Sequence, residues 1–131
     1  MSYYMAATLA TSFDEAIART ESALKREGFG VLTRVDVQQT LKDKIDVDFR
    51  PYTILGACNP KLAHEALQLE DKVGTMLPCN VVVQQKDAGR VEVAAINPTA
   101  SMQAIDNPQL KKAAETVREK LFRVIDSLAD S

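Results

Sequence analysis

The sequence predicts an α+β fold in which helices pack on one face of a largely antiparallel sheet. Segments with strand and helix periodicity alternate along the chain, and the last two strands are separated only by the turn Lys86-Asp87-Ala88-Gly89. Strands joined by so short a turn run antiparallel, which excludes a purely parallel sheet. The chain has 131 residues and no linker, repeat or low-complexity segment, so we expect a single domain over residues 1–131.

The first strand–helix unit is predicted over residues 3–28. Residues 3–10 are apolar and uncharged, which is typical of a short strand. Ser12 and Glu15 then form a capping box, in which each side chain bonds a backbone N–H of the first helical turn. Gly28 is placed to end the helix in the left-handed conformation.

A second strand is predicted over residues 30–35, followed by a short helix from a cap at Asp36 to about residue 45. On this helix we expect Val37, Leu41 and Ile45 to face the protein interior. Charged and apolar residues alternate over residues 46–49, which is also compatible with the start of an extended segment here.

The segment Tyr52–Cys58 predicts a buried strand, and the next two residues predict the start of a helix. Asn59 suits the N-cap, and Pro60 suits the first helical position because the N–H that proline lacks has no partner there. The helix should run to about Leu69. We expect it to bury four side chains: Leu62, Ala63, Ala66 and Leu67.

The rest of the chain predicts a connector over residues 71–78, a hairpin of strands 80–85 and 90–96, and a loop over residues 97–106. Asn107-Pro108 repeats the cap-plus-proline signal, and a long helix should follow to about Leu128. Its apolar residues recur at helical spacing. They are Leu110, Ala114, Val117, Leu121, Val124 and Leu128.

Charge and composition exclude several classes of function. The net charge is −2 and the basic residues are dispersed, so the chain lacks the basic patch of a nucleic-acid-binding protein. No apolar run approaches the ~18 residues of a membrane span. The N-terminus has no Lys or Arg before its apolar stretch, unlike a secretory signal. We therefore expect no nucleic acid or membrane partner, and a cytoplasmic protein with reduced thiols.

Two Cys-Asn pairs are the most informative residues for function. Cys58-Asn59 and Cys79-Asn80 contain the only two cysteines of the chain. Their repetition suggests one ligand site built from two segments. Sequence leaves open whether the thiols meet, because the helix after Cys58 leads ~15 Å away while the extended connector can span ~26 Å back.

Cys58 is the better candidate for a reactive thiol, and thus for a catalytic residue. It precedes a helix N-terminus, where partial positive charge favours a thiolate, and Lys61 in the first turn adds to this. The simpler interpretation is that both cysteines pack as small apolar residues. Asn59 and Asn80 are likewise explained by hydrogen bonds to nearby backbone, Asn59 as N-cap and Asn80 at the start of a strand.

The sequence contains no complete catalytic set. There is no phosphate-binding glycine loop, nucleophile elbow, Ser-His-Asp set or Cys-x-x-Cys motif. His64 is the only histidine, and its spacing from Cys58 and Cys79 matches no zinc pattern, so we interpret it as a surface residue and predict no metal site. The protein is therefore more readily interpreted as a non-enzyme, and the sequence leaves the identity of any cofactor unknown.

The motifs resemble a bacterial and archaeal family known as domain of unknown function 302. The resemblance rests on Gly56-Ala57-Cys58-Asn59-Pro60 and Leu77-Pro78-Cys79-Asn80, with further matches between Phe49 and Met102. It implies a compact α+β domain with a TATA-binding-protein-like fold, commonly a homodimer, and no established activity. One departure is Asn97 before Pro98, where the family more often has Asp.

These observations lead to one main hypothesis and two alternatives. The main hypothesis is a homodimeric, non-enzymatic module that binds a small ligand or partner through Cys58, Asn59, Cys79 and Asn80. The first alternative is a thiol-dependent enzyme, or a sulfur or redox carrier, that uses Cys58 as nucleophile. The second is a purely structural interaction protein in which both cysteines belong to the core.

Overall fold

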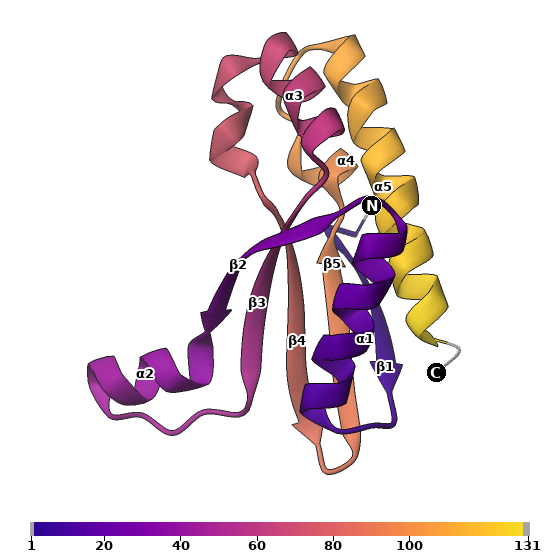
Figure 1. The fold of residues 1–131 in the computed structure, drawn as a ribbon. Coiled ribbons are helices and arrows are strands. Elements are labelled where there is room, and N and C mark those ends of the chain that lie inside the picture. Colours follow the sequence, from indigo (N-terminus) through magenta and orange to yellow (C-terminus); the bar gives the residue numbers. More distant parts are fainter. Residues whose placement is uncertain (1, 130–131) are drawn as a thin grey trace.

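A computed structural model describes residues 2–129. The strands are β1 (Tyr4–Leu9), β2 (Gly30–Asp36), β3 (Tyr52–Cys58), β4 (Cys79–Asp87) and β5 (Arg90–Ile96). The α-helices are α1 (Phe13–Arg26), α2 (Val37–Ile45), α3 (Pro60–Leu69), α4 (Pro98–Ser101) and α5 (Pro108–Ala129), and η1 (Asp71–Met76) is a 3₁₀-helix. The strands form one antiparallel sheet in the order β1-β5-β4-β3-β2 (Figure 1). The predicted α+β fold with its antiparallel sheet is confirmed.

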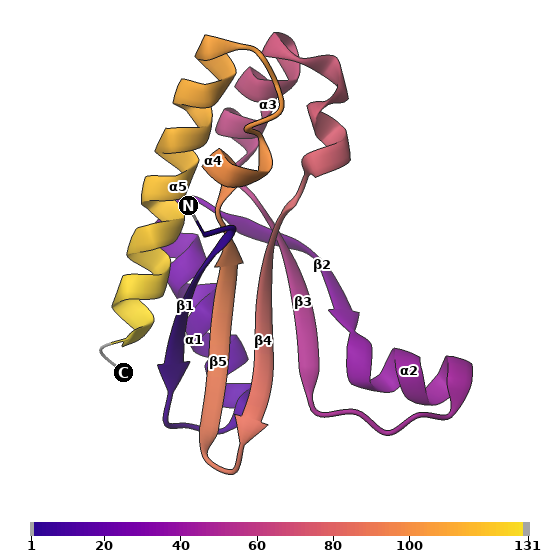
Figure 2. The ribbon, with the colours of Figure 1, turned by 180° about the vertical axis from the view of Figure 1, so that it is seen from behind.

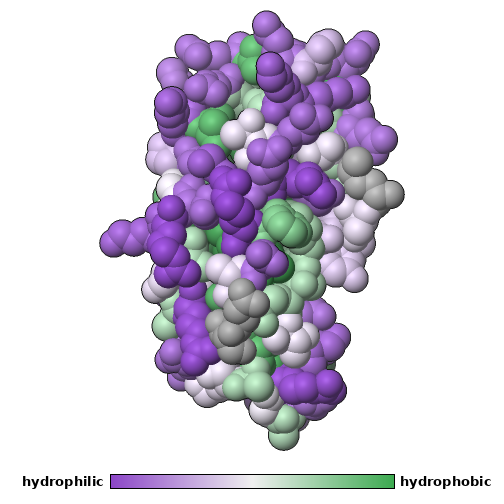
Figure 3. Space-filling model, turned by 90° about the vertical axis from the view of Figure 1, so that its right-hand side faces the viewer, coloured by the Kyte–Doolittle hydropathy of each residue, from purple (hydrophilic) through white to green (hydrophobic). Residues whose placement is uncertain are grey.

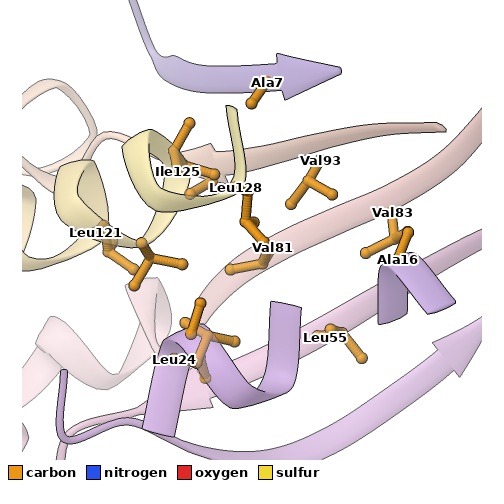
Figure 4. Close-up of a cluster of buried hydrophobic side chains, with 14 of the residues drawn as sticks. Ala7, Ala16, Leu24, Leu55, Val81, Val83, Val93, Leu121, Ile125 and Leu128 are labelled. Carbon is orange, nitrogen blue, oxygen red and sulfur yellow. The ribbon is translucent and has the colours of Figure 1, made fainter. Parts of the chain in front are cut away.

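The main core lies between one face of the sheet and the helices α1 and α5 (Figure 4). Alternate strand residues such as Leu55, Val81 and Val93 point to this face and are fully buried. Leu24 from α1 and Leu121 from α5 close over them. The side of the molecule near α5 is mainly hydrophilic in the upper half of Figure 3, as expected for the outer face of an amphipathic helix.

A second, smaller core lies beyond the end of the sheet. There α3 and α4 pack against the N-terminal half of α5, and η1 packs against α3 (Figures 1 and 2). Its buried residues are Ala66, Val73, Met102, Leu110 and Ala114. Helix α5 has 22 residues, so it is ~33 Å long and reaches across both cores. Its predicted apolar stripe is confirmed, with Val117 half-buried and the other members buried.

No described helix covers the opposite face of the sheet (Figure 2). Strand pairing aligns one apolar residue from each strand across this face. Val35 lies opposite Ile54, Ile54 opposite Val82, Val82 opposite Ala94, and Ala94 opposite Ala6. We call these five residues the open-face row. None of them is fully buried in the single chain, and Val35 and Ala6 are exposed.

Asparagine–proline pairs begin three helices. Asn59 and Asn107 accept hydrogen bonds from the N–H groups of Leu62 and Leu110, as the sequence predicts. Asn97 caps α4 in the same way, through Thr99, and its amide also donates to the Ser2 carbonyl at 3.0 Å. A carboxylate could accept the first bond but could not donate the second. Asparagine at this position therefore makes a hydrogen bond that aspartate would not.

Two burial predictions are wrong. Helix α2 has no buried residue, and Ile45, expected to face inward, is 63% exposed. The reason is that α2 follows the edge strand β2 and projects from the body of the molecule, where it contacts the strands β2 and β3 but does not enter either core (Figures 1 and 2). We call β2 and α2 together the β2–α2 arm. Leu67 on α3 is also exposed rather than buried.

Two short helices, η1 and α4, lie in segments that the sequence predicts as connector and loop. With 6 and 4 residues, they are too short to show a helical repeat of apolar residues. Asn97-Pro98 does carry the cap-plus-proline signal, so the start of α4 was visible in the sequence.

Candidate ligand site at the Cys-Asn motifs

Strand pairing brings the two cysteines to the same end of the sheet. β3 and β4 are antiparallel neighbours, and Ala57 lies directly opposite Cys79. Between them, η1 packs back against α3, so the chain returns to its starting point instead of continuing away from the sheet. Of the two arrangements that the sequence allowed, the structure has the one in which the cysteines lie close together.

Both cysteines line a cavity of about 40 Å³ at the boundary of the two cores. Its walls come from the ends of β3 and β4, from α3, from the segment around α4, and from α5. The lining is mainly apolar. Among the residues that line it are Phe29, Cys58, Asn59, Leu77, Cys79, Met102 and Leu110.

Cys79 is a buried thiol in a setting that opposes its ionisation. Burial raises its pKa from 9.0 to about 11, and the neighbouring Cys58 contributes further to the increase. Cys79 is therefore a neutral thiol at physiological pH. Cys58 is half-buried, and within residues 2–129 neither thiol takes part in a hydrogen bond.

This elevated pKa predicts that stability falls at alkaline pH. The folded protein retains the Cys79 proton up to pH about 11, whereas an unfolded chain loses it near pH 9. Between these values the folded state binds more protons, so the free energy of unfolding should decrease by at most ~1.4 kcal/mol per pH unit. Urea unfolding at pH 8, 9 and 10 measures the slope, and Cys79→Ala should flatten it. An unchanged slope in that variant contradicts the assignment.

Asn59 has a structural role as well as a place in the cavity wall. Its side chain accepts a hydrogen bond from the Leu62 N–H at 3.2 Å and so caps α3. Its amide nitrogen also lies 3.0 Å from where a Cβ at Gly28 would stand. Gly28 has φ of 84°, the predicted left-handed conformation. Its lack of a side chain permits this conformation and also leaves room for the Asn59 amide.

Asn59→Ala should lower the free energy of unfolding by about 1 kcal/mol because α3 loses its cap. Asn59→Asp is the matched control, since a carboxylate also accepts the Leu62 N–H bond, and it should retain most of the stability. Thermal and urea unfolding compare the three proteins. Equal losses in both variants would show that the amide nitrogen, and not the cap, stabilises this corner.

Asn80 lies apart from the other three candidate residues. It follows Cys79 in β4, so its side chain points to the opposite face of the sheet, beside Gly56. There it is exposed, and in the described part of the chain its side chain makes no hydrogen bond, including the expected one to loop backbone. The structure thus groups Cys58, Asn59 and Cys79 and separates Asn80 from them.

Gly56 is a motif residue whose role the sequence analysis missed. A Cβ at this position would collide with Thr33 Oγ1 and would lie 2.7 Å from Pro78 Cγ. Only glycine lets β2 and the segment before β4 approach β3 this closely. Met102 was also missed as a cavity residue, because its place in the cavity wall depends on how α4 packs and leaves no local sequence signal.

His64 lies on the exposed side of α3, as predicted. Within the described residues, no three His, Cys, Asp or Glu side chains are grouped as metal ligands. The cavity also lacks a histidine or carboxylate among its lining residues. Its functional groups are therefore the two thiols, the Met102 thioether and the Asn59 amide.

Comparison with known proteins identifies the family. No curated protein matches the chain. A solved structure described as an uncharacterized conserved protein DUF302 from Bacillus stearothermophilus is 33% identical, with a TM-score of 0.90, and the match covers 98% of this chain and 99% of the other. The model of the family described as "Domain of unknown function DUF302" matches residues 5–128. The chain therefore belongs to the DUF302 family.

Proposed function

We propose that this protein is a homodimeric, non-enzymatic binding module whose ligand site is the cavity between the two cores. The observation that carries the proposal is the convergence of Cys58, Asn59 and Cys79 on that one cavity from two separate strand ends. Nearly all other lining residues are apolar, which leaves few polar groups to orient a ligand, as is common in binding sites.

The size of the cavity supports a ligand of very few atoms. A water molecule needs ~10–15 Å³ of such space, so about 40 Å³ accommodates roughly three atoms of that size. Pockets for metabolites and drug-sized molecules are about ten times larger, ~300–1,000 Å³. This volume matches an ion or a small uncharged molecule.

A thiol-dependent enzyme is not favoured. A nucleophilic cysteine needs its thiolate form, and Cys79 is held in the neutral form by burial. A general base would have to approach Cys58, yet the cavity wall contains no histidine or carboxylate.

The open face of the sheet supports the homodimer. A solvated sheet face normally carries polar residues, whereas the open-face row is apolar at all five positions. Beside it, Tyr3, Tyr4 and Tyr52 border a shallow groove of about 360 Å³, which the polar residues Asn80, Gln84, Lys86 and Glu92 also line. Tyrosine is enriched in protein interfaces. A second copy that presents the same row would bury both faces by two-fold symmetry.

No helix among the described residues is long and apolar enough to cross a membrane. The two unpaired thiols support a reducing compartment, and we include a cytoplasmic location in the proposal on that ground.

Native mass spectrometry of freshly purified protein tests both parts of the proposal. We expect the mass of a dimer and a small additional mass that is lost on denaturation. Leu110→Phe adds volume to the cavity wall and should displace the ligand, whereas Phe122→Leu on the exposed side of the same helix should not. A monomer without additional mass, before and after addition of cell extract, would contradict the proposal.

A further inference from the structure

We propose that the cavity binds one soft monovalent metal ion, Cu(I), through the sulfur atoms of Cys58, Cys79 and Met102. This inference rests on the proposed binding function and names its ligand class. Three sulfur-bearing residues from three separate segments of the chain line a single small cavity. They include both cysteines of the chain, and one of its four methionines.

The placement of the three side chains suits a closed metal site. Cys79 is 7% exposed and Met102 is 6% exposed, while the half-buried Cys58 leaves a path from solvent. Cys79 and Cys58 come from adjacent strand ends, and Met102 immediately follows α4 on the facing wall. Neither thiol has a hydrogen-bond partner in the described residues, so coordination would not have to break one.

The chemistry of the ligands distinguishes Cu(I) from zinc. Thiolates and thioethers are soft ligands that select Cu(I). Structural zinc requires four ligands from Cys, His, Asp or Glu, and within residues 2–129 no group of even three such side chains is available. Two thiolates and one thioether provide a three-coordinate sulfur site without any further ligand.

The charge of the ion offsets part of the charge of the two thiolates, which the mainly apolar cavity would not stabilise by itself. Binding forms two copper–thiolate bonds, releases both thiol protons to solvent and leaves the oxidation state of copper unchanged. The resulting centre has a net charge of about −1, and it would lie at the N-terminus of the ten-residue helix α3. The positive end of a helix dipole stabilises a negative charge there.

The test is a titration of the reduced, full-length protein with Cu(I) under nitrogen, against a chromogenic Cu(I) chelator. We expect one Cu(I) per chain, seen also as a copper adduct in native mass spectrometry, and a near-ultraviolet absorption from copper–thiolate bonds. Cys58→Ser and Cys79→Ser should each weaken binding at least about tenfold. Met102→Leu should weaken it measurably, and Met76→Leu, an exposed methionine on η1, should not.

Met102→Leu conserves volume, so it keeps the test valid if a cysteine variant fails to fold. Absence of stoichiometric binding, or equal affinity in wild type and Met102→Leu, overturns the copper inference. A further outcome is that the wild-type protein fails to bind copper and yet carries a non-metal ligand that the Leu110→Phe variant lacks. In that case only the copper inference fails. If neither is found, the proposed binding function fails with it.

Discussion

Replacing Leu121 with alanine should lower the free energy of unfolding by about 2–5 kcal/mol. Leu121 is fully buried, and α5 places it in the middle of the main core against the sheet (Figure 4). Truncation removes apolar contacts and leaves a cavity that the surrounding strands cannot fill, because they are held in register by their neighbours. Urea unfolding followed by circular dichroism gives the difference directly.

Phe122→Ala is the matched control, since it removes an even larger side chain from the next residue of the same helix. Phe122 is 50% exposed, so its truncation should cost much less than that of Leu121. A similar loss in both variants would show that the outer side of α5 is covered in the assembled protein. That result would contradict the arrangement in which the open sheet face forms the interface.

The local features of this fold were predictable because they depend on neighbouring residues. The bounds of β3, Tyr52–Cys58, and of α3, Pro60–Leu69, agree with the predicted ones. An asparagine followed by proline fixes a helix start through one side-chain hydrogen bond, and Gly28 takes the left-handed turn that other residues avoid.

Burial on the β2–α2 arm was not predictable from local pattern. The spacing of Val37, Leu41 and Ile45 indicates one apolar helix face, but it does not say whether anything packs against that face. The answer depends on the strand order, which places β2 at the edge of the sheet.

The candidate site was predictable in part. Both cysteines were identified, but their proximity depends on the path of η1, a long-range property. The separation of Asn80 from Cys79 was available from the sequence, because consecutive residues of a strand point to opposite faces. Met102 could be assigned to the cavity only once the packing of α4 was known.

The family motif divides into structural and chemical residues. Gly56 permits a close approach of strands, and Asn59 and Pro60 start a helix. These roles explain three of the five residues in Gly56-Ala57-Cys58-Asn59-Pro60 without reference to a ligand. The thiols have no comparable structural bond, and for this reason they carry the functional proposals.

Val82→Lys should convert the proposed dimer to a monomer. Val82 occupies the central strand of the sheet and the middle of the open-face row. In a face-to-face dimer the two sheets lie ~10 Å apart, so two lysines would have to be desolvated within the apolar row, close to each other. The monomer itself should fold normally, because Val82 is not fully buried in the single chain. Sedimentation velocity at micromolar concentration measures the change.

Two further variants locate the interface if the sheet face is not responsible. Phe122→Lys introduces the same charge on the exposed side of α5 and should leave the dimer intact. Ile45→Lys tests the β2–α2 arm, whose residues Leu32, Ile45 and Val47 are also exposed. Dissociation by Ile45→Lys but not by Val82→Lys would assign the interface to the arm. The open-face row would then not pack against the same row of a second copy. Its extension across all five strands would need another explanation.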